Sequence, residues 1–82
     1  MMNRRPKKML SVTVNPDALV PDYEAQDRGR KRFLNRKKNN ETQTWDLINE
    51  GPIDVPPRAE YIKALKSGEL IPANPWTQSF AR

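Results

Sequence analysis

The sequence predicts an extended, proline-rich chain with little regular structure, ordered only within an assembly. Leu, Ile, Val and Phe total 16 of 82 residues, near the level where burial no longer offsets the entropy of ordering. Eight prolines, about twice ordinary usage, each remove a backbone donor and restrict the preceding residue. Without cysteine, no disulfide can hold a small core together. A marginal mini-domain is the alternative.

Short elements are expected along the first half of the chain. Residues 1–9 form a basic arm, and residues 10–14 alternate apolar and polar side chains, which predicts a strand. This strand either packs locally or pairs with the edge of another chain's sheet. Pro21 favours a short helix that continues to Asp27. A second strand is expected over 43–48, with Trp45 and Leu47 on one face.

A short amphipathic helix is predicted over 57–67, where the local signals agree. Pro57 suits the first helical position, and Gly68 suits a left-handed stop. Tyr61, Ile62 and Leu65 share one face of this helix. After it, the prolines and the absence of any period predict an extended tail.

Charge divides the chain into two parts. Residues 1–38 carry 11 basic and 4 acidic side chains, a net charge of +7, whereas residues 39–82 carry 4 and 6, a net charge of −2. Four segments are therefore expected: a basic N-terminal arm and segment at 1–38, an extended connector at 39–55, the short helix at 56–70 and the tail at 71–82. Such polarity bears on partners more than on fold.

The composition excludes several classes of function. Without histidine or cysteine there is no Ser-His-Asp or Cys-His catalysis and no thiolate zinc site. Three glycines cannot form a glycine-rich phosphate loop. The longest apolar runs are far shorter than the roughly 20 residues that a bilayer requires. We expect no enzyme activity, no metal or other cofactor, no small-molecule substrate and no membrane partner.

The strongest electrostatic feature is a run of seven cations within residues 28–38. They are Arg28, Arg30, Lys31, Arg32, Arg36, Lys37 and Lys38. Such a run suits the phosphate backbone of a nucleic acid, with an affinity that falls steeply with salt. It also suits an acidic protein surface, and the sequence leaves both partners open.

Large apolar and aromatic side chains are expected to contact a partner, because such groups dominate protein interfaces. The candidate interface residues are Leu10, Val12, Val14, Trp45, Tyr61, Ile62, Leu65, Trp76 and Phe80. Trp76 and Phe80 are the expected anchors of the tail. The alternative is a modest local core of Trp45, Tyr61, Ile62 and Leu65.

Residues 55–70 carry a pattern of a Val-Pro lead, an aromatic, a basic residue, a leucine and then Gly-acid-apolar. Its members are Val55-Pro56, Tyr61, Lys63, Leu65 and Gly68-Glu69-Leu70. The pattern resembles a family of very short tailed-phage proteins of unknown function, whose genes lie among the tail genes of Mu-like phages. The family's second aromatic is Ile62 here, and its glycine-rich opening is replaced by the basic segment 1–38. The resemblance implies a virion context and assigns no site.

We therefore expect a small non-enzymatic structural protein of a large assembly, a phage virion component of the capsid, neck or tail. It would lie over larger subunits, present in many copies, and stabilise their contacts after assembly in the host cytoplasm. Packaged nucleic acid is a further candidate partner. The alternative is a basic nucleic-acid-binding accessory protein, for example a ribosome-associated one, that acts through residues 28–38.

Overall fold

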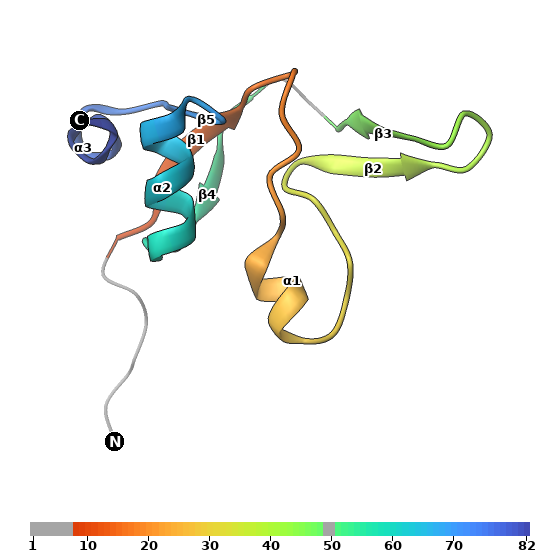
Figure 1. Ribbon diagram of the computed structural model, residues 1–82. Helices are drawn as coiled ribbons and strands as arrows, with labels where there is room; N and C mark the ends of the chain where they lie inside the picture. The colour runs from red at the N-terminus through yellow and green to blue at the C-terminus, as the bar shows by residue number, and fades with distance from the viewer. Residues whose placement is uncertain (1–7, 49–50) are drawn as a thin grey trace.

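The strand β1 (Leu10–Val14) lies at the centre of a three-stranded antiparallel sheet. Its neighbours are β4 (Ile53–Val55) and β5 (Leu70–Pro72), each only three residues long. The structure is a computed structural model that describes residues 8–48 and 51–82. Figure 1 shows this sheet on one side of the molecule and a two-stranded hairpin on the other.

The register of β1 directs alternate side chains into the core. Leu10 lies opposite Val55 on one side, and Val14 lies opposite Leu70 on the other. Because successive side chains of a strand point to opposite faces, Leu10, Val12 and Val14 share one face. All three are buried, whereas the residues between them are half-buried. The apolar–polar alternation in the sequence is therefore the alternation of this strand's two faces.

The helix α2 (Ala59–Ser67) connects β4 to β5 and covers the buried face of the sheet. Its buried residues are Tyr61, Ala64 and Leu65. The helix ends at Gly68, whose φ of 89° lies in the left-handed region that glycine adopts without strain. The helix begins two residues after the predicted Pro57, because Arg58 occupies the N-cap position with extended backbone.

The C-terminal segment docks beside β1 through backbone and side-chain hydrogen bonds. It contains α3 (Pro75–Gln78) and the 3₁₀ helix η1 (Ser79–Ala81). The N–H of Ala73 donates to the carbonyl of Ser11 at 2.8 Å, and the N–H of Ser11 donates to the Thr77 hydroxyl at 2.9 Å. Thr77 is fully buried, so this hydroxyl continues the ladder where β5 ends. The tail predicted to be extended over 71–82 is instead folded onto the sheet.

The first half of the chain adds a short helix and the hairpin. Asp22 caps α1 (Tyr23–Asp27) by accepting a hydrogen bond from the N–H of Ala25 at 3.2 Å. The hairpin pairs β2 (Arg36–Asn39) with β3 (Thr44–Leu47) in antiparallel register. In Figure 1 it projects away from the three-stranded sheet.

Ten buried apolar residues from both halves of the chain form one core. They are Leu10, Val12, Val14, Val20, Leu34, Val55, Tyr61, Ala64, Leu65 and Leu70. Half-buried residues of α3 and η1 pack against this cluster. The chain therefore has a core of its own.

The prediction of an extended chain that is ordered only in an assembly is wrong. Within the described residues the chain forms a compact globule with five strands in two antiparallel sheets and three short α-helices. The prediction rested on the low total of Leu, Ile, Val and Phe. It is wrong because most of these residues come together in a single small cluster. Strands of three residues are also too short to show a period in sequence.

The pairing of β1 also rules out its addition to another chain's sheet, because both of its edges are already occupied. The outer strands β4 and β5 are flanked by or contain Pro52, Pro56 and Pro72. Proline lacks a backbone donor and protects a sheet edge from further pairing. Partner contacts of this protein are therefore expected through side chains.

Replacement of one core residue tests whether this core exists in the isolated chain. Leu65→Ala is expected to lower the free energy of unfolding by about 2–5 kcal/mol, because the buried side chain leaves a cavity. Lys66→Ala, at the adjacent exposed position, is expected to change it by less than about 0.5 kcal/mol. Urea unfolding followed by tryptophan fluorescence measures both. Equal, small effects of the two substitutions would contradict the core.

Candidate functional site

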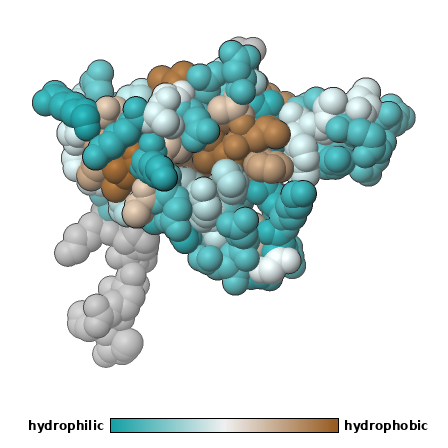
Figure 2. Space-filling view, viewed as in Figure 1, coloured by the Kyte–Doolittle hydropathy of each residue, from teal (hydrophilic) through white to brown (hydrophobic). Residues whose placement is uncertain are grey.

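The largest concentration of free positive charge lies in the loop after α1 and the β2–β3 hairpin, residues 28–48, which we call the basic lobe. Its six exposed cations are Arg28, Arg30, Lys31, Arg32, Lys37 and Lys38. Four lie on the loop and two lie on β2. Figure 1 shows the loop and the hairpin on the side of the molecule away from α3. Figure 2 shows mainly hydrophilic residues over the projecting hairpin.

These six cations have no carboxylate partner within residues 8–48 and 51–82, where every ion pair involves Arg58. Lys38 instead lies over the Trp45 ring, with its Nζ 5.5 Å from the ring centroid. The charges are therefore available to a partner, and uncompensated charge of one sign attracts polyanions.

Arg36, the seventh cation of the predicted basic patch, has a structural role. Its guanidinium donates hydrogen bonds at 2.9–3.3 Å to the backbone carbonyls of Trp45, Asn15, Pro16 and Ala18. These bonds tie the hairpin to the turn that follows β1. The prediction that Arg36 contributes to the basic patch is therefore corrected, since its Nη1 and Nη2 groups are occupied within the chain and its Nε is buried.

Backbone contacts hold the start of the hairpin against the body. The N–H of Leu34 donates to the carbonyl of Val20 at 2.7 Å, and the N–H of Asp22 donates to the carbonyl of Arg32 at 2.9 Å. Phe33 forms an isolated antiparallel bridge with Pro21. The loop that carries four of the six cations is thus fixed at both ends, by α1 and by this bridge.

An aromatic pair packs within the lobe. The rings of Phe33 and Trp45 meet edge to face, with their centroids 5.0 Å apart and an interplanar angle of 76°. Trp45 lies opposite Lys38 in the hairpin register. It is half-buried and lies outside the buried core cluster, in contrast to the predicted local core of Trp45 with residues of α2.

The polar side chains of the hairpin bond mainly to one another. The Asn39 Oδ1 accepts hydrogen bonds from the N–H groups of Glu41 and Thr42 at 3.0 and 3.3 Å. Its Nδ2 donates to Asp46 at 3.2 Å, and the Thr44 hydroxyl donates to the same carboxylate at 2.9 Å. Asp46 is therefore held by neutral donors and forms no ion pair with any residue that the structure describes, although it lies opposite Lys37 in the hairpin register.

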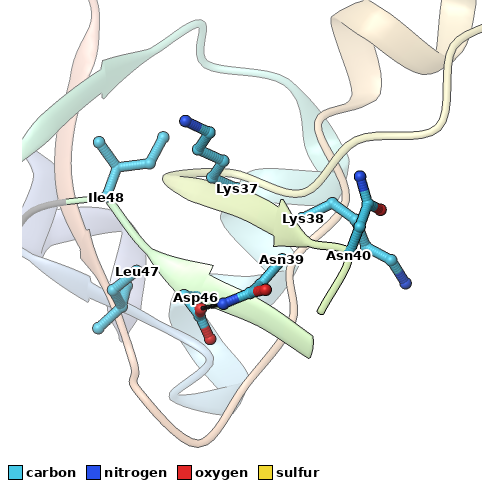
Figure 3. A pocket seen from close by; sticks show the side chains of 7 residues that line it. All are labelled: Lys37, Lys38, Asn39, Asn40, Asp46, Leu47 and Ile48. Carbon is cyan, nitrogen blue, oxygen red and sulfur yellow. Dashed lines mark hydrogen bonds between the residues drawn. The ribbon is translucent and has the colours of Figure 1, made fainter. Parts of the chain in front are cut away.

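The surface has two open depressions, each of about 450 Å³. The first lies at the hairpin and is lined by Lys37, Lys38, Asn39, Asn40, Asp46, Leu47 and Ile48 (Figure 3). The second lies between the start of α1 and α2 and is lined by Val20, Pro21, Tyr23, Glu60, Lys63, Ala64, Ser67 and Glu69. In the part of the chain that the structure describes, no group of three or more acidic residues could hold a metal ion.

Arg58 holds the acidic residues of α1, a role that sequence reasoning missed. Its Nη1 contacts carboxylate oxygens of Glu24 and Asp27 at 2.9 and 3.0 Å, and its Nε contacts Glu60 at 3.0 Å. The hydrogen bond from Arg58 lowers the pKa of Glu60, and these carboxylates raise the pKa of Arg58 itself. In the sequence, Arg58 stands out only by its position just before the helix. Its partners on α1 lie about 30 residues away, so no local pattern reveals them.

Tyr61 joins α2 to α1 from inside the core. Its hydroxyl donates to Glu24 at 2.6 Å and accepts from the N–H of Tyr23 at 2.9 Å. The two tyrosine rings also meet edge to face at 5.4 Å. Burial raises the pKa of Tyr61, and the hydrogen bond to Glu24 adds to this effect. The sequence had suggested that Tyr61 contacts a partner. Because Tyr61 is fully buried, it does not.

The other predicted interface residues also stabilise this chain. Buried in the core are Leu10, Val12, Val14, Tyr61 and Leu65, whereas half-buried positions are taken by Trp45, Ile62, Trp76 and Phe80. The rings of Trp76 and Phe80 meet edge to face at 5.0 Å and pack against the core. The exposed large apolar residues are Met9, Leu19, Ile48 and Ile71, none of which sequence reasoning proposed as contacts.

Comparison with protein-family models, curated proteins and solved structures finds no match. Among the described residues, no helix has the length and apolar character needed to cross a membrane. The function is therefore argued from the chain's own residues.

The environment of Tyr61 predicts a loss of stability at alkaline pH. Because its pKa is raised in the folded state, folding favours the protonated phenol. The stability from this group is fully present below the unfolded pKa of about 10 and is lost as the pH rises through and above that value. We expect urea unfolding midpoints to fall over this range.

Tyr61→Phe is the matched variant for this titration. It is expected to lower the free energy of unfolding at neutral pH by about 1–3 kcal/mol, because Glu24 and the Tyr23 N–H lose a partner. It should also remove the part of the alkaline decline that Tyr61 causes. An identical alkaline decline in both proteins would show that this phenol does not titrate as described.

Proposed function

We propose that this chain is a small non-enzymatic structural protein of a phage virion, a component of the capsid, neck or tail that contacts larger subunits and stabilises their association. The proposal is carried by one observation: the segment with the phage-like pattern, 55–70, runs from the end of β4 through α2 to the start of β5 and contributes five of the ten core residues. Its setting would be the virion, after assembly in the host cytoplasm.

Five positions of the pattern have a physical role in this segment, whereas Lys63 and Glu69 are exposed. Val55 and Leu70 are buried on the two strands that flank β1, at 2% and 1% exposure. Tyr61 and Leu65 fill the space between α2 and the sheet, and Gly68 reverses the chain between them and β5. The apolar residues and the glycine of the pattern are therefore those that this fold needs. This coincidence supports a common fold.

The mode of contact differs from the extended chain that the sequence suggested. A folded body with proline-protected sheet edges meets larger subunits through surface side chains. Ile48 and Ile71, at 58% and 45% exposure, are the apolar side chains suited to such contacts. The lack of histidine and cysteine supports a role without catalysis.

A nucleic-acid-binding accessory protein, such as a ribosome-associated one, is the second candidate function. The six exposed and unpaired cations of the basic lobe favour it, because neutralisation of phosphates drives such binding.

Analysis of purified particles tests the first proposal. Particles produced from a phage genome that carries this coding sequence are expected to contain the chain after density-gradient purification, in a constant ratio to the major structural proteins. Quantitative mass spectrometry measures that ratio. Recovery of the chain with host ribosomes and its absence from particles would overturn the virion proposal in favour of the second candidate.

A further inference from the structure

We propose that the basic lobe binds the phosphate backbone of double-stranded nucleic acid and does not read its base sequence. This inference rests on the proposed function for its setting and deepens it, because it names the partner of one surface. It holds equally for the second candidate function.

The first argument is the placement of charge. Four exposed cations lie on the loop 28–32 and two lie on β2, and no acidic residue occurs from position 28 to position 40. Like charges held this close together repel one another, and a polyanion relieves that repulsion. A duplex is the densest natural polyanion of this kind, with one charge per about 1.7 Å of its axis.

Three of the nearby acidic side chains are engaged elsewhere, whereas Glu41, exposed at the turn of the hairpin, reduces the net charge of the lobe. Glu24 and Asp27, on the helix before the loop, contact Arg58 at 2.9 and 3.0 Å. Asp46, on the strand beside β2, accepts hydrogen bonds from Asn39 and Thr44. Within the described residues, the positive charge of the lobe is therefore not neutralised by ion pairs of its own.

The backbone of the lobe is already ordered. Arg36 donates to four carbonyls, and Leu34 is buried with its N–H bonded to Val20. Binding would then order only the cationic side chains, which lowers the entropic cost of association. This distinguishes the lobe from a flexible basic tail.

An acidic protein is the less suitable partner. Protein interfaces have aromatic or apolar anchors at their centre and charged residues at the rim. In residues 28–38 the apolar side chains are Phe33 and Leu34, which are half-buried and buried. The exposed apolar residue of the lobe, Ile48, follows β3 and lies outside this run. The cations of residues 28–38 have no exposed apolar anchor among them, which matches contacts to phosphate, since these come mainly from Arg and Lys.

Single strands and base edges are also poorly matched. Single-strand binding uses aromatic faces on which bases stack. Trp45 packs against the ring of Phe33, and Lys38 lies over the Trp45 face. Two of the hairpin's side-chain amides, groups that can read base edges, are occupied too. Asn39 bonds within the hairpin, and the Gln43 Nε2 donates to the carbonyl of Asn40 at 2.6 Å.

Fluorescence anisotropy with the full chain and a labelled DNA duplex of mixed sequence tests this inference. If all six cations meet phosphates, the slope of log affinity against log salt is expected to be about −5, so affinity falls roughly 10³-fold from about 50 to 200 mM salt. A duplex of scrambled sequence should bind equally. A single strand of equal length and polyglutamate should bind more weakly.

Three double variants separate local contacts from net charge, since each removes two cations. Arg30→Gln with Lys31→Gln alters the loop, and Lys37→Gln with Lys38→Gln alters the hairpin. Each pair should reduce the magnitude of the slope by about 2. Lys63→Gln with Lys66→Gln, exposed on α2, is the matched control and should leave the slope unchanged. Circular dichroism verifies that each variant folds.

Several results would overturn the inference. They are no binding to the duplex, an equal reduction of the salt slope in the α2 control and the lobe variants, tighter binding to the single strand than to the duplex, and equal binding to polyglutamate and to the duplex. The last result would assign the lobe to an acidic protein surface. None of them bears on the presence of the chain in particles, so failure here is distinguishable from failure of the virion proposal.

Discussion

The pairing of β1 with two three-residue strands is the constraint on which the rest of the structure depends. Strands as short as β4 and β5 are not stable alone, and each is held because β1 lies between them. Both run antiparallel to β1 and therefore parallel to each other, which requires a crossover connection between them. The helix α2 is that connection, and its Tyr61 and Leu65 close the core. Even the C-terminal segment joins through β1, by way of the Thr77 hydroxyl.

Electrostatics then separates the molecule into two regions. In sequence, the acids of α1 lie in the basic half of the chain and reduce its net charge. In the fold, Arg58 from the other half of the chain contacts two of these acids. Positive and negative charge are therefore separated more clearly on the surface than along the sequence. The same contacts join α1 to α2, together with the hydrogen bonds of Tyr61. One cluster thus stabilises the fold and leaves the basic lobe uncompensated.

The lobe combines an ordered backbone with free charges. Contacts within the chain stabilise the hairpin. They come from Arg36, from the Phe33–Trp45 ring pair and from the hydrogen bonds of Asn39. The aromatic pair and the Asn39 amide are engaged within the chain, and the six exposed cations form no ion pairs within the described residues. This division of roles favours a contact that depends on charge and is tolerant of the details of its partner. A contact of that kind would suit the structural role proposed for this chain.

The sequence by itself determined the elements whose signals are local: the alternation of β1, the helix before Gly68 and a short helix that ends at Asp27, although the structure begins that helix at Tyr23 and not at Pro21. It also determined the run of cations and the absence of histidine and cysteine. Only the tertiary structure decided which residues are contacts and which are core, since Tyr61 and Leu65 look equally suited to either role. It alone showed that Arg36 and Arg58 are structural, because their partners lie up to 34 residues away. β4 and β5 cannot be predicted from local periodicity. Each has only three residues and forms a strand by pairing with β1, whose residues lie more than 40 positions away in the sequence.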